Sequence, residues 1–468
     1  MNNHKENLSY VIFLAMVAAL GGFLFGYDTA VISGTIGSVA ARFSLDDVST
    51  GWYVGCALAG SIFGVVIAGK LSDQFGRKAV LLLSAVLFSG SAIGCMLAAN
   101  IDQLIWYRII GGIGIGTASV ISPLYISEIS VARYRGTLVS LYQLAITIGF
   151  IGAYLVNYAI SEYAAQMKQS GAGTGITEKY FVEETWRGML GAESLPAIFF
   201  VLVLFFIPES PRWLIVKGNA IRALSIFGRI YGKEQARSQV NELTTLAQAE
   251  KQSDWRLLFQ PGFRVALFIG LSLAILGQFM GVNAVLYYGP SIFQQTGLSE
   301  GDSLLYQVIV GLVNFGSTVL AMAVIDRIGR KKLVYYGVSG MIVSLILIGF
   351  YFVVNKTATV IPPMTLLILV LIYIFSCAIS ICVVIWVLLS EMYPAKVRGL
   401  AMSAAGLSLW IGTYLIGQLT PWLMSAISPA GVFWLFALMC IPYLWITWKM
   451  VPETTGKSLE EIERMWKK

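Results

Sequence analysis

The sequence predicts an all-α membrane protein with twelve transmembrane helices in two pseudo-symmetric six-helix halves. The chain has 468 residues, of which 57% are hydrophobic and only 12% are charged, whereas charged residues make up about a quarter of a soluble domain. Apolar stretches of about twenty residues, long enough to cross a bilayer core of about 30 Å, recur along the chain. Short charged sequence motifs also occur twice, about half the chain apart; these motifs are called the repeated phrases below.

Each of the twelve apolar stretches is expected to form one spanning helix. In chain order they are Tyr10–Thr35, Gly51–Lys70, Ala79–Ala98, Leu104–Tyr125, Leu138–Ile160, Leu190–Ile207, Val265–Tyr288, Leu304–Ile325, Leu333–Val353, Pro363–Leu389, Ala401–Leu419 and Val432–Val451. These give an N-terminal half (1–208), a polar middle segment (209–263), a C-terminal half (264–451) and a tail (452–468). Alternating basic and apolar residues in the middle segment favour short amphipathic helices, and a solvated linker is the alternative.

The repeated phrases lie at the edges of apolar segments, at equivalent places in the two halves. Asp-Gln-Phe-Gly-Arg-Lys at 73–78 returns as Asp-Arg-Ile-Gly-Arg-Lys at 326–331. Ser-Glu followed by Arg-Gly occurs at 127–136 and again at 390–399, and Pro-Glu occurs at 208–209 and 452–453. Many secondary transporters are built from duplicated membrane halves, so the repeat points to a mechanism as well as to a fold.

The net charge of +7 records membrane topology rather than a nucleic-acid partner. If the N-terminus is cytoplasmic, most Lys and Arg residues fall on the cytoplasmic side, and the predicted outer side has only Arg42, Lys168, Lys179, Arg187 and Lys356. This is the positive-inside bias, which places both termini in the cytoplasm. The first apolar run is too long for a cleavable signal peptide and is expected to remain as a spanning helix.

Composition also argues against an enzyme, a metal site or a bound cofactor. The five cysteines all lie in apolar segments without metal-ligand spacing, so packing is their expected role. The only histidine, His4, precedes the first helix, and no buried nucleophile–base pair is evident. The glycine run at 111–116 lies within an apolar helix with no preceding strand, which predicts close helix packing rather than phosphate binding.

Three ionisable residues interrupt spanning segments: Asp28, Arg108 and Glu193. Such a charge costs at least about 2.5–3.5 kcal/mol at mid-helix, so each should have a partner or a function. If Asp28 and Arg108 meet, the pairing offsets the cost of each buried charge. Movement of the arginine away would then favour proton uptake by the carboxylate. A permanent ion pair is the alternative. Glu193 either joins this relay or reaches the membrane interface.

The repeated phrases, with Pro-Glu-Ser-Pro-Arg-Trp at 208–213, resemble the signatures of sugar porters in the major facilitator superfamily across essentially the whole chain. Residues 25–34 closely resemble bacterial proton–xylose symporters, whereas facilitative animal glucose transporters carry asparagine at the position of Asp28. The resemblance implies proton-coupled symport of a monosaccharide or sugar-like solute by alternating access. Asp28 would accept the proton, Arg108 would be its gating partner and Glu193 an accessory acid.

The resemblance also implies two sets of binding and gating residues. The sugar would be bound by Gln278, Asn283 and Asn314 and by the aromatic residues Phe25, Tyr287, Trp386 and Trp410. A cytoplasmic gate network would contain Asp73, Arg77, Glu128, Arg135, Glu209 and Arg212 in one half, and Asp326, Arg330, Glu391, Arg398 and Glu453 in the other. The expected setting is a monomer in the bacterial inner (plasma) membrane, in contact with lipid, without a cofactor.

The sequence departs from the family pattern in its predicted pocket. Phe150, Gly277 and Leu409 stand where the family has glutamines, and Cys-Val-Val-Ile-Trp at 382–386 replaces Gly-Pro-x-x-Trp. The pocket is thus expected to suit a less polar ligand, such as a deoxy or modified sugar, or a sugar held by Gln143 and Thr147. Two alternative functions remain: a proton-independent facilitator, and a solute-binding sensor with little transport, which the missing helix-breaking proline and the loss of polar pocket residues favour.

Overall fold

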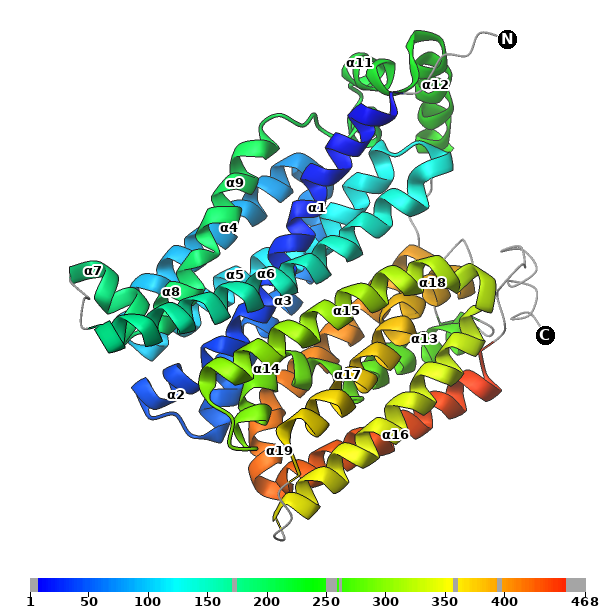
Figure 1. Cartoon of the computed structure of the whole chain (residues 1–468). Coiled ribbons are helices and arrows are strands. Elements are labelled where there is room, and N and C mark those ends of the chain that lie inside the picture. The colour runs from blue at the N-terminus through cyan, green and yellow to red at the C-terminus, as the bar shows by residue number, and fades with distance from the viewer. Residues whose placement is uncertain are drawn as a thin grey trace. The chain divides into compact units, whose positions relative to one another are not determined.

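The computed structural model describes residues 7–170, 175–249, 259–260, 263–356, 361–393 and 398–451 (Figure 1). Within these ranges every regular element is a helix, and eleven helical stretches are long and apolar enough to cross a membrane. The prediction of an all-α membrane protein is therefore confirmed.

The first six predicted spans form α1 (Leu8–Val31) with the 3₁₀ turn η1 (Ile32–Gly34), α3 (Asp47–Phe75), α4 (Arg77–Leu97), α5 (Ile101–Ile129), α6 (Arg135–Ser170), and α8 (Thr185–Ala192) with α9 (Ser194–Leu204). Short elements between them are α2 (Ile36–Phe43), η2 (Ala132–Tyr134), α7 (Gly175–Glu178) and η3 (Lys179–Glu183). The later spans form α13 (Phe263–Phe279) with α14 (Val282–Gln294), α15 (Glu300–Ile328), α16 (Arg330–Lys356), α17 (Pro363–Ile379) with α18 (Ile381–Met392), and α19 (Arg398–Lys449).

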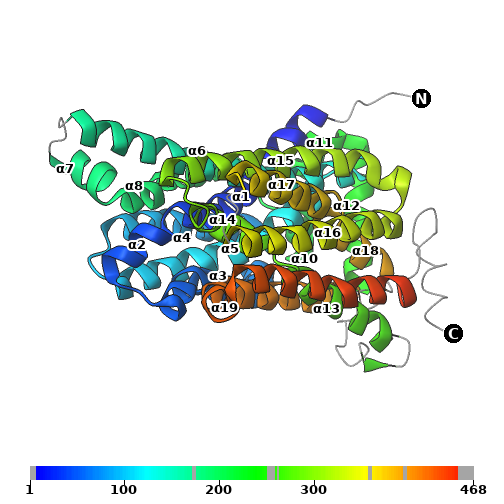
Figure 2. The same cartoon turned by 60° about the horizontal axis from the view of Figure 1, so that its bottom comes forward.

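Helix α19 accounts for the difference between twelve predicted spans and eleven stretches. Its 52 residues would be about 78 Å long if straight, more than twice the bilayer core. Ser428 leaves the helical region with φ 70° and ψ 158°. Two helices therefore meet at Ser428, and they correspond to the predicted spans Ala401–Leu419 and Val432–Val451. Its neighbour α16 lies beside it in both views (Figures 1 and 2).

Two predicted spans are broken helices. The seventh is interrupted at Gly281, whose φ of 89° favours glycine, and a Cβ there would lie 2.2 Å from the Phe436 ring. The tenth is interrupted at Ser380, with φ −114° and ψ −89°. The sequence has Val383 in place of the usual proline of this helix, and the structure breaks the helix three residues earlier, at Ser380. The Ser380 hydroxyl donates to the Ser376 carbonyl oxygen at 2.6 Å, so a side chain replaces a lost backbone donor.

The middle segment forms α10 (Pro211–Val216), α11 (Ala220–Tyr231) and α12 (Lys233–Ala249). Helix α11 buries Ala223, Phe227 and Ile230 and exposes its basic residues, so this helix is amphipathic. The Asn7 backbone N–H donates to the Ile230 carbonyl oxygen at 2.9 Å, which joins α11 to the chain just before α1 (Figure 1). Helix α11 therefore holds the chain at the start of the first span.

The described residues pack as two compact units. Unit 1 contains those of Met1–Thr29, Gly60–Ala153 and Arg187–Gln252, and unit 2 contains those of Ala30–Ala59, Tyr154–Trp186 and Ser253–Lys468. Helices α1, α3, α6 and α8 each continue from one unit into the other. The units cut across the predicted halves, whose boundaries stay a prediction.

Glycines let α3 and α5 approach closely within unit 1. A Cβ on Gly60 would lie 2.3 Å from the Ile109 carbonyl oxygen, and one on Gly116 would lie 2.1 Å from that of Ser61. Real side chains do not tolerate such distances, so both positions need glycine. The prediction that the run at 111–116 serves helix packing is confirmed.

Candidate functional site

Helix α1 packs closely on α6 just before its charged residue, Asp28. A Cβ on Gly26 would lie 2.0 Å from the Ile146 carbonyl oxygen, and one on Gly149 would lie 2.1 Å from that of Phe23. Two residues after Gly26, the Asp28 side chain meets Arg108 of α5: Arg108 Nη1 donates to Asp28 Oδ1 at 2.5 Å.

The Asp28–Arg108 pair is sealed from solvent. The two side chains are 1% and 3% exposed, and the pairing expected from the cost of isolated membrane charges is present. A charged pair in this setting needs both partners, because removal of one leaves an uncompensated buried charge.

Glycine at position 111 leaves room for this pair. A Cβ there would lie 2.9 Å from Asp28 Oδ2 and 2.5 Å from Ser91 Oγ. We expect Gly111→Ala to displace the carboxylate, at an overpacking cost of about 1–3 kcal/mol, and to reduce proton-driven uptake. Uptake in proteoliposomes and the thermal midpoint measure this, with Gly90→Ala as control because nothing lies within 4 Å of a Cβ there. Wild-type behaviour of both variants would contradict this role for Gly111.

Glu193 lies between α8 and α9 and is only 3% exposed. Of the two alternatives for this residue, the structure places the side chain inside the protein rather than at an interface. Its Oε1 atom has no hydrogen-bond partner among the described residues, and its carboxyl group is within electrostatic range of Asp28 and Arg108. Unit 1 thus brings all three predicted proton-coupling residues together.

Three polar side chains meet beside the break between α13 and α14 in unit 2. The Oε1 atom of Gln278 accepts hydrogen bonds from Asn283 Nδ2 at 2.7 Å and from Thr413 Oγ1 at 3.0 Å. The break exposes the carbonyl of Met280, which accepts from the Tyr373 hydroxyl at 2.7 Å. A broken helix lined by amides is a typical solute site in transporters.

Thr413 was missed from the sequence. It lies one helical turn after Leu409, the position where a family glutamine is absent, and its hydroxyl reaches the same cluster as Gln278. Gly277 leaves ordinary space, since a Cβ there would be 3.5 Å from its nearest neighbour, on Ile381. A hydroxyl spaced three residues after Trp410, on the same helix face, is the signal that could have identified Thr413.

The remaining predicted sugar residues divide between the two units. Asn314, Tyr287, Trp386 and Trp410 belong to unit 2, and Phe25, Gln143 and Phe150 belong to unit 1. Asn314 is buried, and its side-chain amide makes no hydrogen bond within the described part of the chain. Trp386 is 38% exposed, whereas Trp410 and Tyr287 are buried.

The first copy of the predicted gate network forms a compact cluster in unit 1. Arg77 donates to both carboxylate oxygens of Glu128 at 3.0–3.2 Å, and Ser210, which was not predicted, donates to Glu128 Oε2 at 2.5 Å. Asp73 lies 3.5 Å from Arg77 at the exposed rim. Arg135 and Arg212 form no ion pair with any described residue.

Glu209 caps the N-terminus of α4. Its Oε1 atom accepts from the backbone N–H groups of Arg77 at 2.9 Å and Lys78 at 3.1 Å, where the helix dipole favours a negative charge. Gly76 has φ 98°, and a Cβ there would lie 2.3 Å from Glu209 Oε2. The glycine of the repeated phrase therefore makes room for the glutamate.

The second copy repeats part of this geometry. Gly329 has φ 95°, close to that of Gly76. The Lys331 ammonium donates to the carbonyls of Trp448 and Val451 at 3.0 Å, as Lys78 donates to that of Phe205 at 3.1 Å. Arg330 begins α16 and is half-buried. The side chains of Asp326, Glu391 and Arg398, and all of Glu453, lie outside the described residues.

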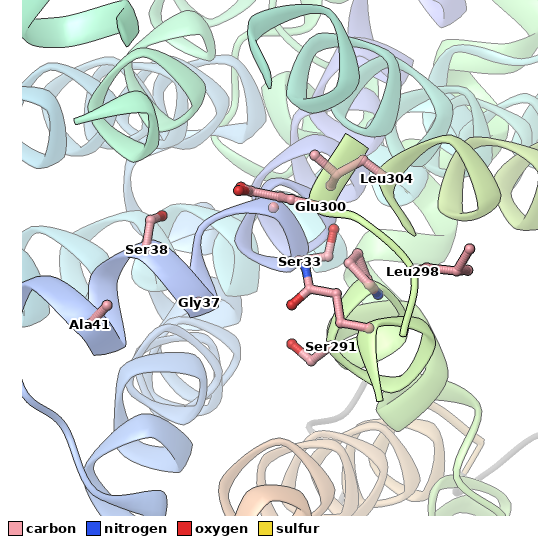
Figure 3. Close-up of a pocket in the computed structure, with 11 residues that line it drawn as sticks. Ser33, Gly37, Ser38, Ala41, Ser291, Leu298, Glu300 and Leu304 are labelled. Carbon is pink, nitrogen blue, oxygen red and sulfur yellow. The ribbon is translucent and has the colours of Figure 1, made fainter. Parts of the chain in front are cut away.

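In unit 2, α6 is tied to α14 through a carbonyl that a proline releases. Pro290 cannot donate to the carbonyl four residues before it, and this Leu286 oxygen instead accepts from the Tyr154 hydroxyl at 2.9 Å and Gln307 Nε2 at 3.1 Å. Pro290 also lines a cavity of about 470 Å³, with Leu304 and oxygens of Ser33, Ser38, Ser291 and Glu300 around it (Figure 3).

Comparisons with known proteins find relatives along nearly the whole chain. A family model described as "Sugar (and other) transporter" matches residues 14–466. The arabinose-proton symporter of Bacillus subtilis is 38% identical over 99% of this chain and 96% of its own length. The D-xylose-proton symporter of Escherichia coli K12 is 36% identical over 99% of this chain and 97% of its own length.

Solved structures of the Escherichia coli xylose transporter agree with the fold. Its inward open conformation matches with a TM-score of 0.83 at 34% identity, covering 98% of this chain and 100% of that one. The same transporter bound to 6-bromo-6-deoxy-D-glucose, described there as a proton:xylose symporter of the major facilitator superfamily, matches with a TM-score of 0.79 at 36% identity over the same shares. This chain is a multi-pass membrane protein that belongs to the sugar transporter family of the major facilitator superfamily.

Proposed function

We propose that the protein takes up a monosaccharide together with protons by alternating access, as a monomer in the bacterial inner membrane with both termini in the cytoplasm. The observation that carries this proposal is the solvent-sealed pair of Asp28 and Arg108. A facilitator that couples to no ion has no need of a titratable carboxylate there, and such a charge is expensive in a membrane.

The contacts of Asp28 support a proton cycle. Protonation of this carboxyl group removes the charge that attracts Arg108, which favours movement of the arginine toward another acceptor. Glu193 offers one, because its buried Oε1 atom has no partner among the described residues. Release of the proton restores the Asp28–Arg108 pair, so the occupancy of one proton site selects between two arrangements of α1 and α5.

The contacts of Gln278 support sugar binding. The Asn283 amide donates to Gln278 Oε1 across the helix break, and a sugar hydroxyl would replace this bond at little net cost. The Tyr154 hydroxyl ties α6 to the Leu286 carbonyl of α14, the helix that follows this break. Because Ser380 still breaks the tenth helix, the missing proline no longer favours a sensor without transport.

Uptake into proteoliposomes tests the function. With an imposed inward proton gradient, arabinose, xylose or glucose should accumulate above its outside concentration, and a collapsed gradient should remove the excess. Exchange without accumulation would show a facilitator, and binding without exchange would show a sensor. If none of these sugars is exchanged, deoxy sugars and inositols are tested next; failure of all of them would overturn the substrate class.

Thr413→Val tests the unpredicted member of the sugar site. Loss of one hydrogen bond to Gln278 should weaken apparent sugar affinity by about 0.5–1.5 kcal/mol, or roughly two- to tenfold. Counterflow KM measures this effect. Thr447→Val is the matched control on α19, because the Thr447 hydroxyl is buried and, among the described residues, donates to the Tyr443 carbonyl of its own helix alone. Equal KM values for both variants would remove Thr413 from the site.

A further inference from the structure

The break in the tenth spanning helix is flanked by two thiols that face each other. Cys377 lies in the last turn of α17 and Cys382 at the start of α18, and their sulfur atoms are 3.7 Å apart. Residues five apart do not face each other on a straight helix; the backbone at Ser380 brings these two together. The sequence predicts only packing for both, because no spacing rule anticipates the break.

We propose that Cys377 and Cys382 form a reversible oxidation site whose disulfide fixes the angle between α17 and α18. The sulfurs need to approach by roughly 1.7 Å to reach bonding distance. Cys382 is half-buried and Cys377 is 1% exposed, so Cys382 is the more accessible thiol and Cys377 takes the role of the resolving thiol.

The chemistry balances with a peroxide as oxidant. The Cys382 thiolate attacks one peroxide oxygen, which gives a sulfenic acid and releases water or an alcohol. The Cys377 thiol then attacks this sulfur, which forms the disulfide and releases one molecule of water. Two thiol hydrogens and two electrons leave the protein, and a dithiol reductant returns them.

Closure of this bond would affect transport through the position of Trp386. This residue follows Cys382 by one helical turn on α18. Helix α16 packs closely against the break at Gly337, since a Cβ there would lie 2.1 Å from Ser380 Oγ. A bond across the break would therefore prevent the change of angle that alternating access requires of a broken helix. This consequence rests on the proposed function, whereas the thiol chemistry does not.

Hydrogen peroxide treatment of the purified full-length protein tests the site. We expect a loss of about 2 Da, a fall from five free thiols to three, and a peptide linking Cys377 to Cys382. Sugar counterflow should fall at least about tenfold and return with dithiothreitol. Cys382→Ser should keep counterflow after treatment, and Cys440→Ser should behave as wild type.

Each outcome has a separate meaning. Five thiols remaining after treatment, or a bond to Cys440, would overturn the proposal. A Cys377–Cys382 bond without any change in counterflow would overturn the link to the helix angle. If the untreated protein shows no counterflow at all, the proposed function fails, and the mass and thiol readouts still decide the oxidation site.

Discussion

Asp28→Asn is expected to abolish accumulation of the sugar against its gradient while exchange between equal pools continues. Asparagine has the shape of the aspartate but takes up no proton at neutral pH, so sugar movement is no longer coupled to proton movement. A pH difference of two units is worth about 2.7 kcal/mol per proton, which permits roughly 100-fold accumulation with one-proton coupling. The variant should stay at a ratio of one.

Proteoliposomes with an imposed pH difference measure the accumulation ratio, and counterflow in the same vesicles shows that the variant is folded. Asp28→Glu keeps a carboxyl group and is the control that should retain some accumulation. Because Asp28→Asn leaves Arg108 buried without its partner, a loss of counterflow would call for the double variant with Arg108→Gln. Uphill uptake by Asp28→Asn equal to wild type would exclude Asp28 as the proton site.

Glu128→Gln is expected to cause the largest loss of stability among the gate substitutions. Glu128 and Arg77 are 8% and 12% exposed, and removal of one partner of a buried pair typically costs about 3–5 kcal/mol. Glutamine keeps the volume but leaves the arginine without its charge partner and Ser210 with a weaker acceptor. The midpoint of thermal unfolding in detergent measures the loss.

Asp73→Asn is the matched control, because it removes a carboxylate that faces the same arginine. Asp73 is 79% exposed and 3.5 Å from Arg77, so its loss should cost at most about 1 kcal/mol. Similar midpoint shifts for the two substitutions would show that burial does not determine how much each carboxylate contributes to stability.

The spans were predictable because a membrane helix must satisfy its backbone internally and cover its surface with apolar side chains. The Asp28–Arg108 pair was predictable for the complementary reason that an unpaired charge is costly there. The Ser380 break was not, because the rule ties breaks to proline, whereas here a serine hydroxyl satisfies the freed carbonyl. Thr413 was equally hidden, since its hydroxyl also bonds to its own helix at Leu409, as most helical threonines do.

The lysine of each repeated phrase holds the end of a distant helix. Lys78 and Lys331 each cap the carbonyl end of a much later helix, 127 and 117–120 residues downstream, and each follows a glycine with a positive φ. In both copies of the phrase, a lysine side chain therefore supplies donors to carbonyls near a helix C-terminus, where the last turn has no backbone N–H groups of its own to satisfy them.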